Sequence, residues 1–240
     1  MVPLRFLNSG ETMLVVEFGD CIDATLNERV LALDDALRSA ALPGVVELTP
    51  TFRSLAIHYE PLTLDRARLI AQVLELEAKA EITTRPSKIW TLPCCYEAPH
   101  GEDLVEVAAR MNMTPARLIE LHTSAPFRVH MYGFAPGFAY LGGLPDALHV
   151  SRRNSPRAPH PANAIMIGGG MSAIASVPMP TGWWVIGRTP EKMFAPGRNP
   201  EFLVAVGDDI RFEPVNSATF TALETRCRNG EIIARAEAKR

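Results

Sequence analysis

Residues 133–145 read GFAPGFAYLGGLP, and this run, with the short segments around it, decides the fold of the C-terminal part of the chain. Four glycines, two prolines and three aromatic residues share its thirteen positions, so it cannot form a regular helix and makes a poor strand. From Phe127 onward, β-forming segments alternate with glycine and proline, a pattern typical of a β-barrel or sandwich. The expected strands are residues 127–133, 164–168, 172–177, 183–187, 202–206 and 209–215.

Signals on both sides complete this domain. Thr114 is a good N-cap residue and Pro115 suits the first helical position, so a helix is expected to begin there. The tail, residues 229–240, is expected to be a frayed helical end. The other elements expected upstream are a strand at 89–97 and helices at 102–111 and 116–122.

The first 80 residues follow a β-β-α-β-β-α order. Leu26, Val30, Leu33 and Leu37 recur at helical spacing and form one apolar stripe. This order predicts helices packed on one face of an antiparallel sheet. The expected strands are 4–8, 12–18, 45–49 and 52–60, and a second helix is expected to begin near Thr63, with Leu69, Val73 and Leu76 on one face.

A polar stretch at residues 83–88 indicates a domain boundary. We therefore expect an N-terminal α+β domain at residues 1–86 and a β-barrel domain at residues 87–240.

The composition argues against several classes of function. The net charge of −3 gives no global argument for binding nucleic acid or an anionic membrane. No stretch has 18 uninterrupted apolar residues, and the N-terminus lacks the apolar region of a signal peptide, so a cytoplasmic protein is expected. The four cysteines follow no CxxC or zinc spacing and the histidines no paired spacing, so no metal site is expected.

Two motifs raise further functions that we weigh against simpler explanations. Residues 104–121 have the length of a DNA-binding helix pair, but Glu120 accompanies Arg117 and two packed helices explain the pattern equally well. The glycines at 168–170 lack the lysine of a phosphate-binding loop and lie between β-like segments, so a tight turn explains them. We therefore expect no cofactor bound by an evident motif.

Residues 151–163, SRRNSPRAPHPAN, form a basic loop without an acid. The loop carries Arg152, Arg153, Arg157 and His160, and three prolines restrict its backbone. Several guanidinium groups on a stiff loop can hold a carboxylate or a phosphate bidentately. A solvated surface loop, or a contact to a neighbouring polypeptide, is the alternative.

Residues 180–190, PTGWWVIGRTP, place two adjacent tryptophans on an expected strand. On a regular strand Trp184 and Arg188 share one face and Trp183 lies on the other. One tryptophan can then fill the barrel core while the other packs outside or lines a cleft. Packing of both in the core is the alternative.

Taken in order, these segments resemble the allophanate hydrolase subunit 1 family, a carboxyltransferase-domain family that includes the B subunit of 5-oxoprolinase and a bacterial sporulation-kinase inhibitor. The resemblance spans residues 10–215. The sequence departs from the family pattern at PHPANA, residues 159–164, and at Pro180–Trp183, which flank the expected cleft. The segments that resemble the family most clearly are 133–145, 151–157, 164–170, 182–190 and 194–215.

The resemblance implies an α+β protein with a small N-terminal α/β sandwich domain and a C-terminal cyclophilin-like β-barrel carrying two helices. It also implies assembly with a homologous C-type subunit, similar to allophanate hydrolase subunit 2, and with an A-type subunit. The implied reaction opens the lactam of 5-oxo-L-proline to L-glutamate, with ATP as a co-substrate of the complex and this chain inactive alone. A member of a urea carboxylase or allophanate hydrolase pathway, or a non-catalytic histidine-kinase inhibitor, is the alternative.

Lactam opening requires a fixed carboxylate, an activated carbonyl and an aimed water. We expect this chain to supply part of a shared cleft, since aromatic, glycine and arginine residues gather in residues 133–188. The aromatic residues would form an apolar wall and the arginines would hold a carboxylate or phosphoryl group; no catalytic residue stands out. The candidates are Phe134, Gly137, Phe138, Tyr140, Arg152, Arg153, Arg157, Trp184 and Arg188.

Overall fold

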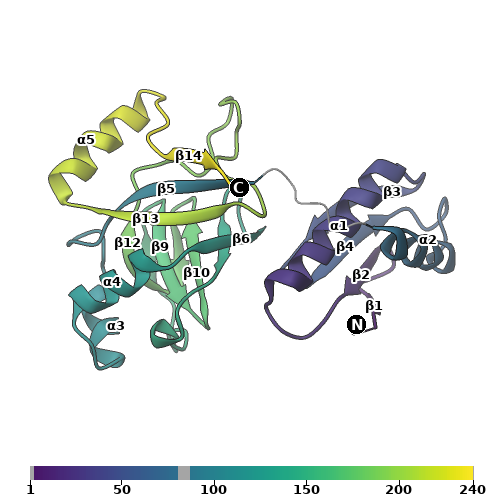
Figure 1. Cartoon of the computed structure of the whole chain (residues 1–240), viewed down its shortest axis with the longest axis horizontal. Helices are drawn as coiled ribbons and strands as arrows, with labels where there is room; N and C mark the ends of the chain where they lie inside the picture. The colour runs from purple at the N-terminus through teal and green to yellow at the C-terminus, as the bar shows by residue number, and fades with distance from the viewer. Residues whose placement is uncertain (1–2, 81–86, 240) are drawn as a thin grey trace. The chain divides into compact units, whose positions relative to one another are not determined.

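Figure 1 shows the computed structural model, which describes residues 3–80 and 87–239. The chain divides into two compact units, Met1–Arg85 and Pro86–Arg240, and each is described by itself. The expected boundary between residues 86 and 87 adjoins the segment 81–86, which lies outside the described residues. The domain limits therefore stay a prediction.

The first unit is a four-stranded antiparallel sheet with two helices (Figure 1). The apolar stripe of the first helix is confirmed, because Val30, Leu33 and Leu37 are buried in one cluster with sheet residues such as Leu14 and Ile57. The strand order is β1-β2-β4-β3. The elements are β1 (Arg5–Asn8), β2 (Met13–Glu17), α1 (Ala24–Ala40), β3 (Val45–Pro50), β4 (Ser54–Tyr59) and α2 (Arg66–Lys79).

Side-chain caps set where these helices begin. Asp23 accepts hydrogen bonds from the backbone N–H groups of Thr25 and Leu26, at 2.8 and 3.0 Å. The expectation that the second helix begins near Thr63 is wrong by a few residues, because Asp65 caps α2 and accepts from the Arg68 N–H at 2.9 Å. An N-cap side chain satisfies backbone donors that the first turn leaves free, so the helix begins one residue after it.

In residues 87–239, seven strands close into a barrel in the order β12-β9-β10-β7-β6-β13-β5, and the pairing of Arg188 with Cys95 joins β12 to β5. Strands β13 and β5 run parallel and the other barrel pairs are antiparallel. The barrel is the predicted one. Its strands are β5 (Lys88–Cys95), β6 (Phe127–Tyr132), β7 (Ala139–Gly142), β9 (Ala164–Gly168), β10 (Met171–Ala175), β12 (Trp184–Arg188) and β13 (Asp209–Val215).

Helices and a short ribbon surround this barrel. Thr114 caps α4 as predicted and accepts from the Arg117 N–H at 3.2 Å, with Pro115 at the first helical position. Leu104 of α3 and Leu118 of α4 belong to the barrel core. The surrounding elements are α3 (Leu104–Arg110), α4 (Pro115–Ser124), η1 (Asp146–Leu148), β8 (Arg157–His160), β11 (Met179–Thr181), α5 (Ser217–Arg228) and β14 (Arg235–Ala238).

Two sequence-based expectations at the C-terminal end are wrong. Phe202 forms one isolated bridge with Phe194, and residues 203–206 form bends and a turn rather than a strand. The Asp208 carboxylate holds this turn, because it accepts from the Ala205 N–H at 2.8 Å and from Trp90 Nε1 at 2.8 Å. The tail is not helical, since Arg235–Ala238 pairs with β5 as β14. The helix instead precedes the tail as α5, capped by Asn216, which accepts from the Thr219 N–H at 2.8 Å.

Candidate functional site

Residues 133–138 of the glycine-rich segment form a tight connection between β6 and β7, whereas Ala139–Gly142 form β7 itself, so the expectation of a poor strand is wrong for that half. Gly133 N–H donates to the Phe138 carbonyl at 3.2 Å and Phe138 N–H donates to the Ala135 carbonyl at 3.0 Å. Gly137 has φ +76° and packs so closely that a Cβ there would lie 2.5 Å from Phe194 Cβ. Phe134 has φ +69°, unusual for a bulky residue, and its side chain is 74% exposed. The segment therefore buries Phe138 and presents Phe134 to solvent.

Aromatic rings connect this segment to the basic loop. Neighbouring ring centroids lie 5.8 Å apart for Phe134 and Phe138, 4.8 Å for Phe138 and Tyr140, and 6.2 Å for Tyr140 and Trp183. The Arg152 guanidinium lies over Trp183, with Cζ 4.8 Å from the ring centroid. The structure thus brings the aromatic segment and the basic loop together. Phe138 and Trp183 belong to an apolar cluster separate from the barrel core.

A β-bulge in β12 changes which residues share a face. Val185 pairs with Met166 and Gly187 with Ile165, so one extra residue lies between them. A bulge reverses the alternation beyond it, and Arg188 therefore shares the outer face of Val185 rather than the face of Trp184. The expectation that Trp184 and Arg188 lie on one face is wrong. Trp184 packs in the barrel core and Trp183 in the outer cluster, so the two tryptophans divide as the sequence suggested.

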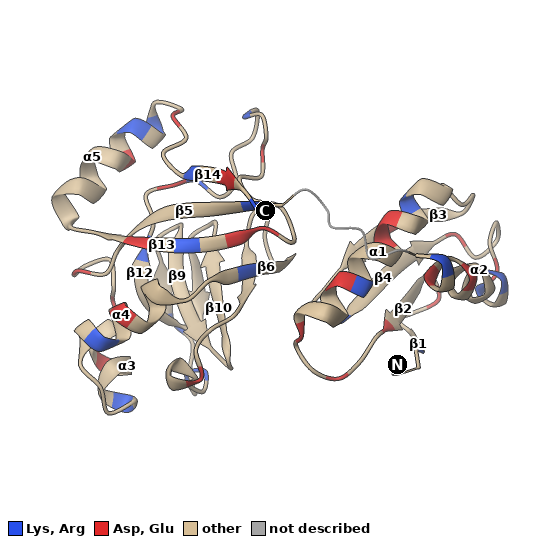
Figure 2. Ribbon diagram, viewed as in Figure 1, with Lys and Arg blue, Asp and Glu red and all other residues tan. Residues whose placement is uncertain are grey.

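Two arginines of the basic loop converge on a buried carboxylate. Asp103, which is 6% exposed, accepts from Arg153 Nη1 at 3.3 Å, from Arg157 Nη1 at 2.7 Å and from the Val185 N–H at 2.8 Å. Arg157 Nη2 also pairs with Glu102. The acids that precede α3 therefore neutralise part of a loop that contains no acid itself. Figure 2 shows a similar mixture of the two charge signs along β13.

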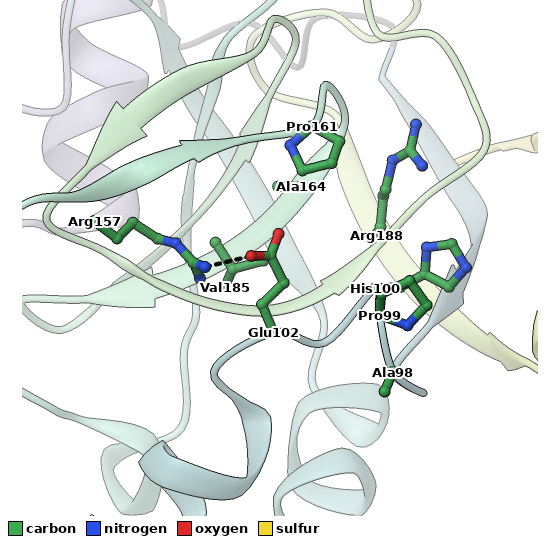
Figure 3. A pocket seen from close by; sticks show the side chains of 9 residues that line it. All are labelled: Ala98, Pro99, His100, Glu102, Arg157, Pro161, Ala164, Val185 and Arg188. Carbon is green, nitrogen blue, oxygen red and sulfur yellow. Dashed lines mark hydrogen bonds and ion pairs between the residues drawn. The ribbon is translucent and has the colours of Figure 1, made fainter.

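Figure 3 shows a pocket that contains two of the expected arginines, which we call the Arg188 pocket. Its volume is about 450 Å³, and Arg157 and Arg188 lie on opposite sides, with Glu102 between them. Arg188 donates from Nε to the Ala162 carbonyl at 2.9 Å and from Nη2 to Glu224 at 3.0 Å. The lining residues are Ala98, Pro99, His100, Glu102, Arg157, Pro161, Ala164, Val185 and Arg188.

His100 gives this pocket a group that is neutral near pH 7. The His100 ring lies against Phe220, with centroids 4.0 Å apart, and Cζ of Arg188 lies 5.2 Å from the centroid of the Phe220 ring. Burial and the charge of Arg188 lower the pKa of His100. A neutral imidazole near the Arg188 guanidinium can donate or accept a hydrogen bond without adding charge.

The second pocket, which we call the Arg152 pocket, has a volume of about 640 Å³. Arg152, Arg153 and Trp184 line it, whereas Phe134, Phe138 and Tyr140 line neither pocket. The expected residues therefore divide among the aromatic segment, of which Phe134 is exposed and Phe138 buried, and these two pockets. The lining residues are Glu106, Arg110, Met111, Ala147, His149, Val150, Ser151, Arg152, Arg153, Asn154, Ser155 and Trp184.

Several residues of these pockets were missed by sequence reasoning. Glu102, which lines the Arg188 pocket, and Asp103 beside it are the first two residues of the helix expected at 102–111, and they directly precede the observed α3. Arg110 reaches the Arg152 pocket from α3, which no local pattern indicates, whereas His149 directly precedes the basic loop in the sequence. Among residues 3–80 and 87–239, no group of three His, Cys, Asp or Glu residues could hold a metal ion. No helix in that part of the chain is long and apolar enough to cross a membrane.

The sequence places this architecture in a known class. Residues 4–204 match the family described as carboxyltransferase domain, subdomain C and D, and the chain belongs to that family. Within the family, it is homologous to the B subunit of 5-oxoprolinase. The Bacillus subtilis (strain 168) protein of that name is 30% identical over 227 residues, which cover 89% of this chain and 93% of that protein. The Escherichia coli O157:H7 protein is 34% identical over 208 residues, covering 85% and 93%.

Solved structures extend the comparison. TTHA0988 superposes with a TM-score of 0.75 at 32% identity, and the match covers 85% of this chain but 40% of that one. The urea amidolyase of K. lactis superposes with a TM-score of 0.83 at 19% identity, covering 98% of this chain and 16% of that one. The second likeness shows a shared fold alone. In both cases the chain matches one part of a much longer polypeptide.

Proposed function

We propose that this chain is the B subunit of an ATP-dependent 5-oxoprolinase complex, which opens 5-oxo-L-proline to L-glutamate. One observation carries the proposal. Two proteins that bear the name of the 5-oxoprolinase B subunit are 30% and 34% identical to the chain, and each match covers 93% of the relative's length. Similarity over nearly the whole relative supports a corresponding place in a corresponding complex.

The Arg188 pocket is the proposed position of the lactam. Its volume of about 450 Å³ exceeds the needs of a single five-membered ring, and its apolar lining includes Val185 and Pro161. Nη1 of Arg188 has no hydrogen-bond partner among the described residues, since the hydrogen bonds of this side chain use Nε and Nη2. The substrate carboxylate would bind there as a charge-assisted acceptor, with Arg157 on the opposite side.

Partner subunits would complete the reaction. The chain is proposed to assemble with the C-type and A-type subunits of such a complex, in keeping with the subunit name of its relatives. ATP, as the co-substrate of the complex, would transfer its terminal phosphoryl group to the lactam oxygen and leave as ADP. Water would then attack the activated carbon, the ring C–N bond would break to leave a glutamyl phosphate, and a second water would release inorganic phosphate and L-glutamate. The match to only 40% of TTHA0988 supports a requirement for additional polypeptide.

The test is reconstitution with homologues of the A-type and C-type subunits. Glutamate release should require ATP and all three chains. In this complex we expect Arg188→Ala to lower kcat/KM for 5-oxoproline about tenfold or more, because one charge-assisted hydrogen bond to the carboxylate is lost. Arg188→Lys keeps the charge without the planar guanidinium, so its kcat/KM should lie between those of the natural sequence and Arg188→Ala.

Arg117→Ala is the matched control, because Arg117 lies on α4 and pairs only with Glu120 among the described residues. Unchanged kcat/KM in folded Arg188→Ala would contradict the carboxylate site. A complex of all three chains that releases no glutamate would contradict the proposed function itself. If the chain supported only a urea- or allophanate-dependent reaction, a role in that pathway would be favoured instead, in keeping with its 22% identity to a urea amidolyase.

A further inference from the structure

The Arg152 pocket carries a surplus of positive charge. Three arginines line it, Arg110, Arg152 and Arg153, against a single acid, Glu106. The arginines and the glutamate of this lining contribute 3 − 1 = +2. A concave site with this balance attracts anions and concentrates them.

Tryptophan rings hold all three guanidinium groups. Arg110 and Arg153 lie over Trp184, with Cζ 4.8 and 4.5 Å from the ring centroid, and Arg152 lies over Trp183 at 4.8 Å. The platform is fixed, because Trp184 is buried and its Nε1 donates to the Ser151 carbonyl at 2.8 Å. A guanidinium stacked on a ring keeps its N–H groups available in its own plane, so these donors are placed before a ligand arrives.

Protein carboxylates do not satisfy these donors fully. Arg152 has no carboxylate within 4 Å among the described residues, although its ring contact orders it. Arg110 and Arg153 share Glu106, at 3.0 and 3.7 Å, and Arg153 also pairs with Asp103 at 3.3 Å. Nε of Arg153 is buried without a hydrogen-bond partner. An anion with several oxygens would supply the acceptors that this cluster lacks.

We propose that the Arg152 pocket binds the phosphate chain of a nucleotide. A polyphosphate offers many acceptor oxygens and several charges, which matches three convergent guanidiniums better than a monocarboxylate does. The turn at Gly168–Gly170 borders this cluster, since a Cβ on Gly169 would lie 3.6 Å from Arg152 Nε and one on Gly170 3.7 Å from the His149 ring. The inference rests on the proposed function only in naming ATP as the nucleotide.

The test uses the full chain without partners. ATP, tripolyphosphate, inorganic phosphate and 5-oxoproline are titrated separately, by calorimetry and by the fluorescence of Trp183 and Trp184. We expect ATP and tripolyphosphate to bind and 5-oxoproline not to displace them. Arg152→Ala should weaken both about tenfold or more, because one charge-assisted contact to phosphate is lost. The control is Arg211→Ala, an exposed arginine on β13 that pairs with Glu237.

Two results would overturn the site: no binding of either polyphosphate to the full chain, or equal affinity for Arg152→Ala and the natural sequence. Weaker binding in Arg211→Ala of the same size would also overturn it, since the effect would then be global charge. Failure here separates from failure of the proposed function. A chain that binds ATP through Arg152 but supports no 5-oxoproline opening keeps this site, and an active complex whose chain binds no polyphosphate loses only this site.

Discussion

Gly137 is the residue at which the glycine-rich segment least tolerates a side chain. Its φ of +76° lies in the left-handed region, and a Cβ would meet Phe194 Cβ at 2.5 Å. We expect Gly137→Ala to lower the free energy of unfolding by roughly 2–5 kcal/mol, the sum of backbone strain and overpacking. Urea unfolding followed by tryptophan fluorescence measures the effect, because all three tryptophans lie between residues 90 and 184.

Gly197 provides a control for the backbone contribution alone. Its φ of +78° is nearly the same, but no atom lies within 4 Å of an added Cβ. Gly197→Ala should therefore cost only the strain, roughly 1–2 kcal/mol. Equal losses in the two variants would contradict the close approach to Phe194 as the reason for glycine at position 137.

Residue types were predictable here, whereas their partners were not. Composition alone marked Arg153 and Arg157 as candidates for binding an anion, and the loop does hold carboxylates. Those carboxylates belong to this same chain. Asp103 lies some fifty positions before the two arginines in the sequence, so the loop itself gives no sign of it. Spacing within a loop carries no information about a charge that the fold brings from elsewhere.

At the scale of elements, periodicity found the regular strands and missed the irregular one. The alternation in β12 predicted opposite faces for Trp183 and Trp184, which is what the structure has. It failed at Arg188, because the bulge between Val185 and Gly187 adds one residue against β9. A bulge is a property of the pair of strands, so the sequence of one strand does not reveal it.

The C-terminal strand shows how one buried side chain can decide an element. Glu191 has no exposed surface, and its carboxylate accepts from the N–H groups of Ile233 and Ala234 at 2.7 and 2.9 Å. These bonds hold the chain directly before β14 against the barrel. They explain why the tail pairs with β5 instead of extending α5 as a helix.

We expect Glu191→Gln to loosen β14, because the charged acceptor for two backbone donors is replaced by a weaker neutral one. Amide hydrogen exchange over residues 233–238 should accelerate by about tenfold or more, while β9 and β10 keep their protection. Glu213→Gln is the control, since Glu213 contacts Arg235 of the same strand at 3.0 Å but is half-exposed. Similar acceleration in both variants would contradict the role given to Glu191.

For the whole molecule, local pattern was enough for the architecture and insufficient for the sites. The β-β-α-β-β-α order gave the first unit, and frequent turn signals gave the barrel, because binary pattern and turn chemistry act within a few residues. Both pockets combine residues from segments far apart in the chain, such as Glu102 with Arg188 and Arg110 with Arg152. Such combinations exist only once the barrel has closed.

Closure of the barrel also makes its stability depend on pH through His122. This side chain is fully buried between Phe127 and Phe212, and Nδ1 lies 2.8 Å from the Tyr96 hydroxyl. Burial lowers the pKa of His122 to about 3. The folded state therefore resists protonation while the unfolded state, with an ordinary pKa near 6.5, takes up a proton, so stability is lost as the pH falls from about 6.5 towards 3.

We expect the free energy of unfolding to fall by about 2 kcal/mol between pH 7 and pH 5 through this group alone, and His122→Gln to remove that part of the slope. The slope, rather than absolute stability, is the quantity to compare, because the substitution also disturbs packing against the two rings. His149→Gln, the same exchange at a partly exposed histidine, is the control for the substitution itself. Urea unfolding followed by tryptophan fluorescence at the two pH values measures this slope. An equal pH dependence in His122→Gln and the natural sequence would mean that acid destabilises the barrel through other groups. His100 and His160 would then be replaced next, because burial lowers the pKa of both.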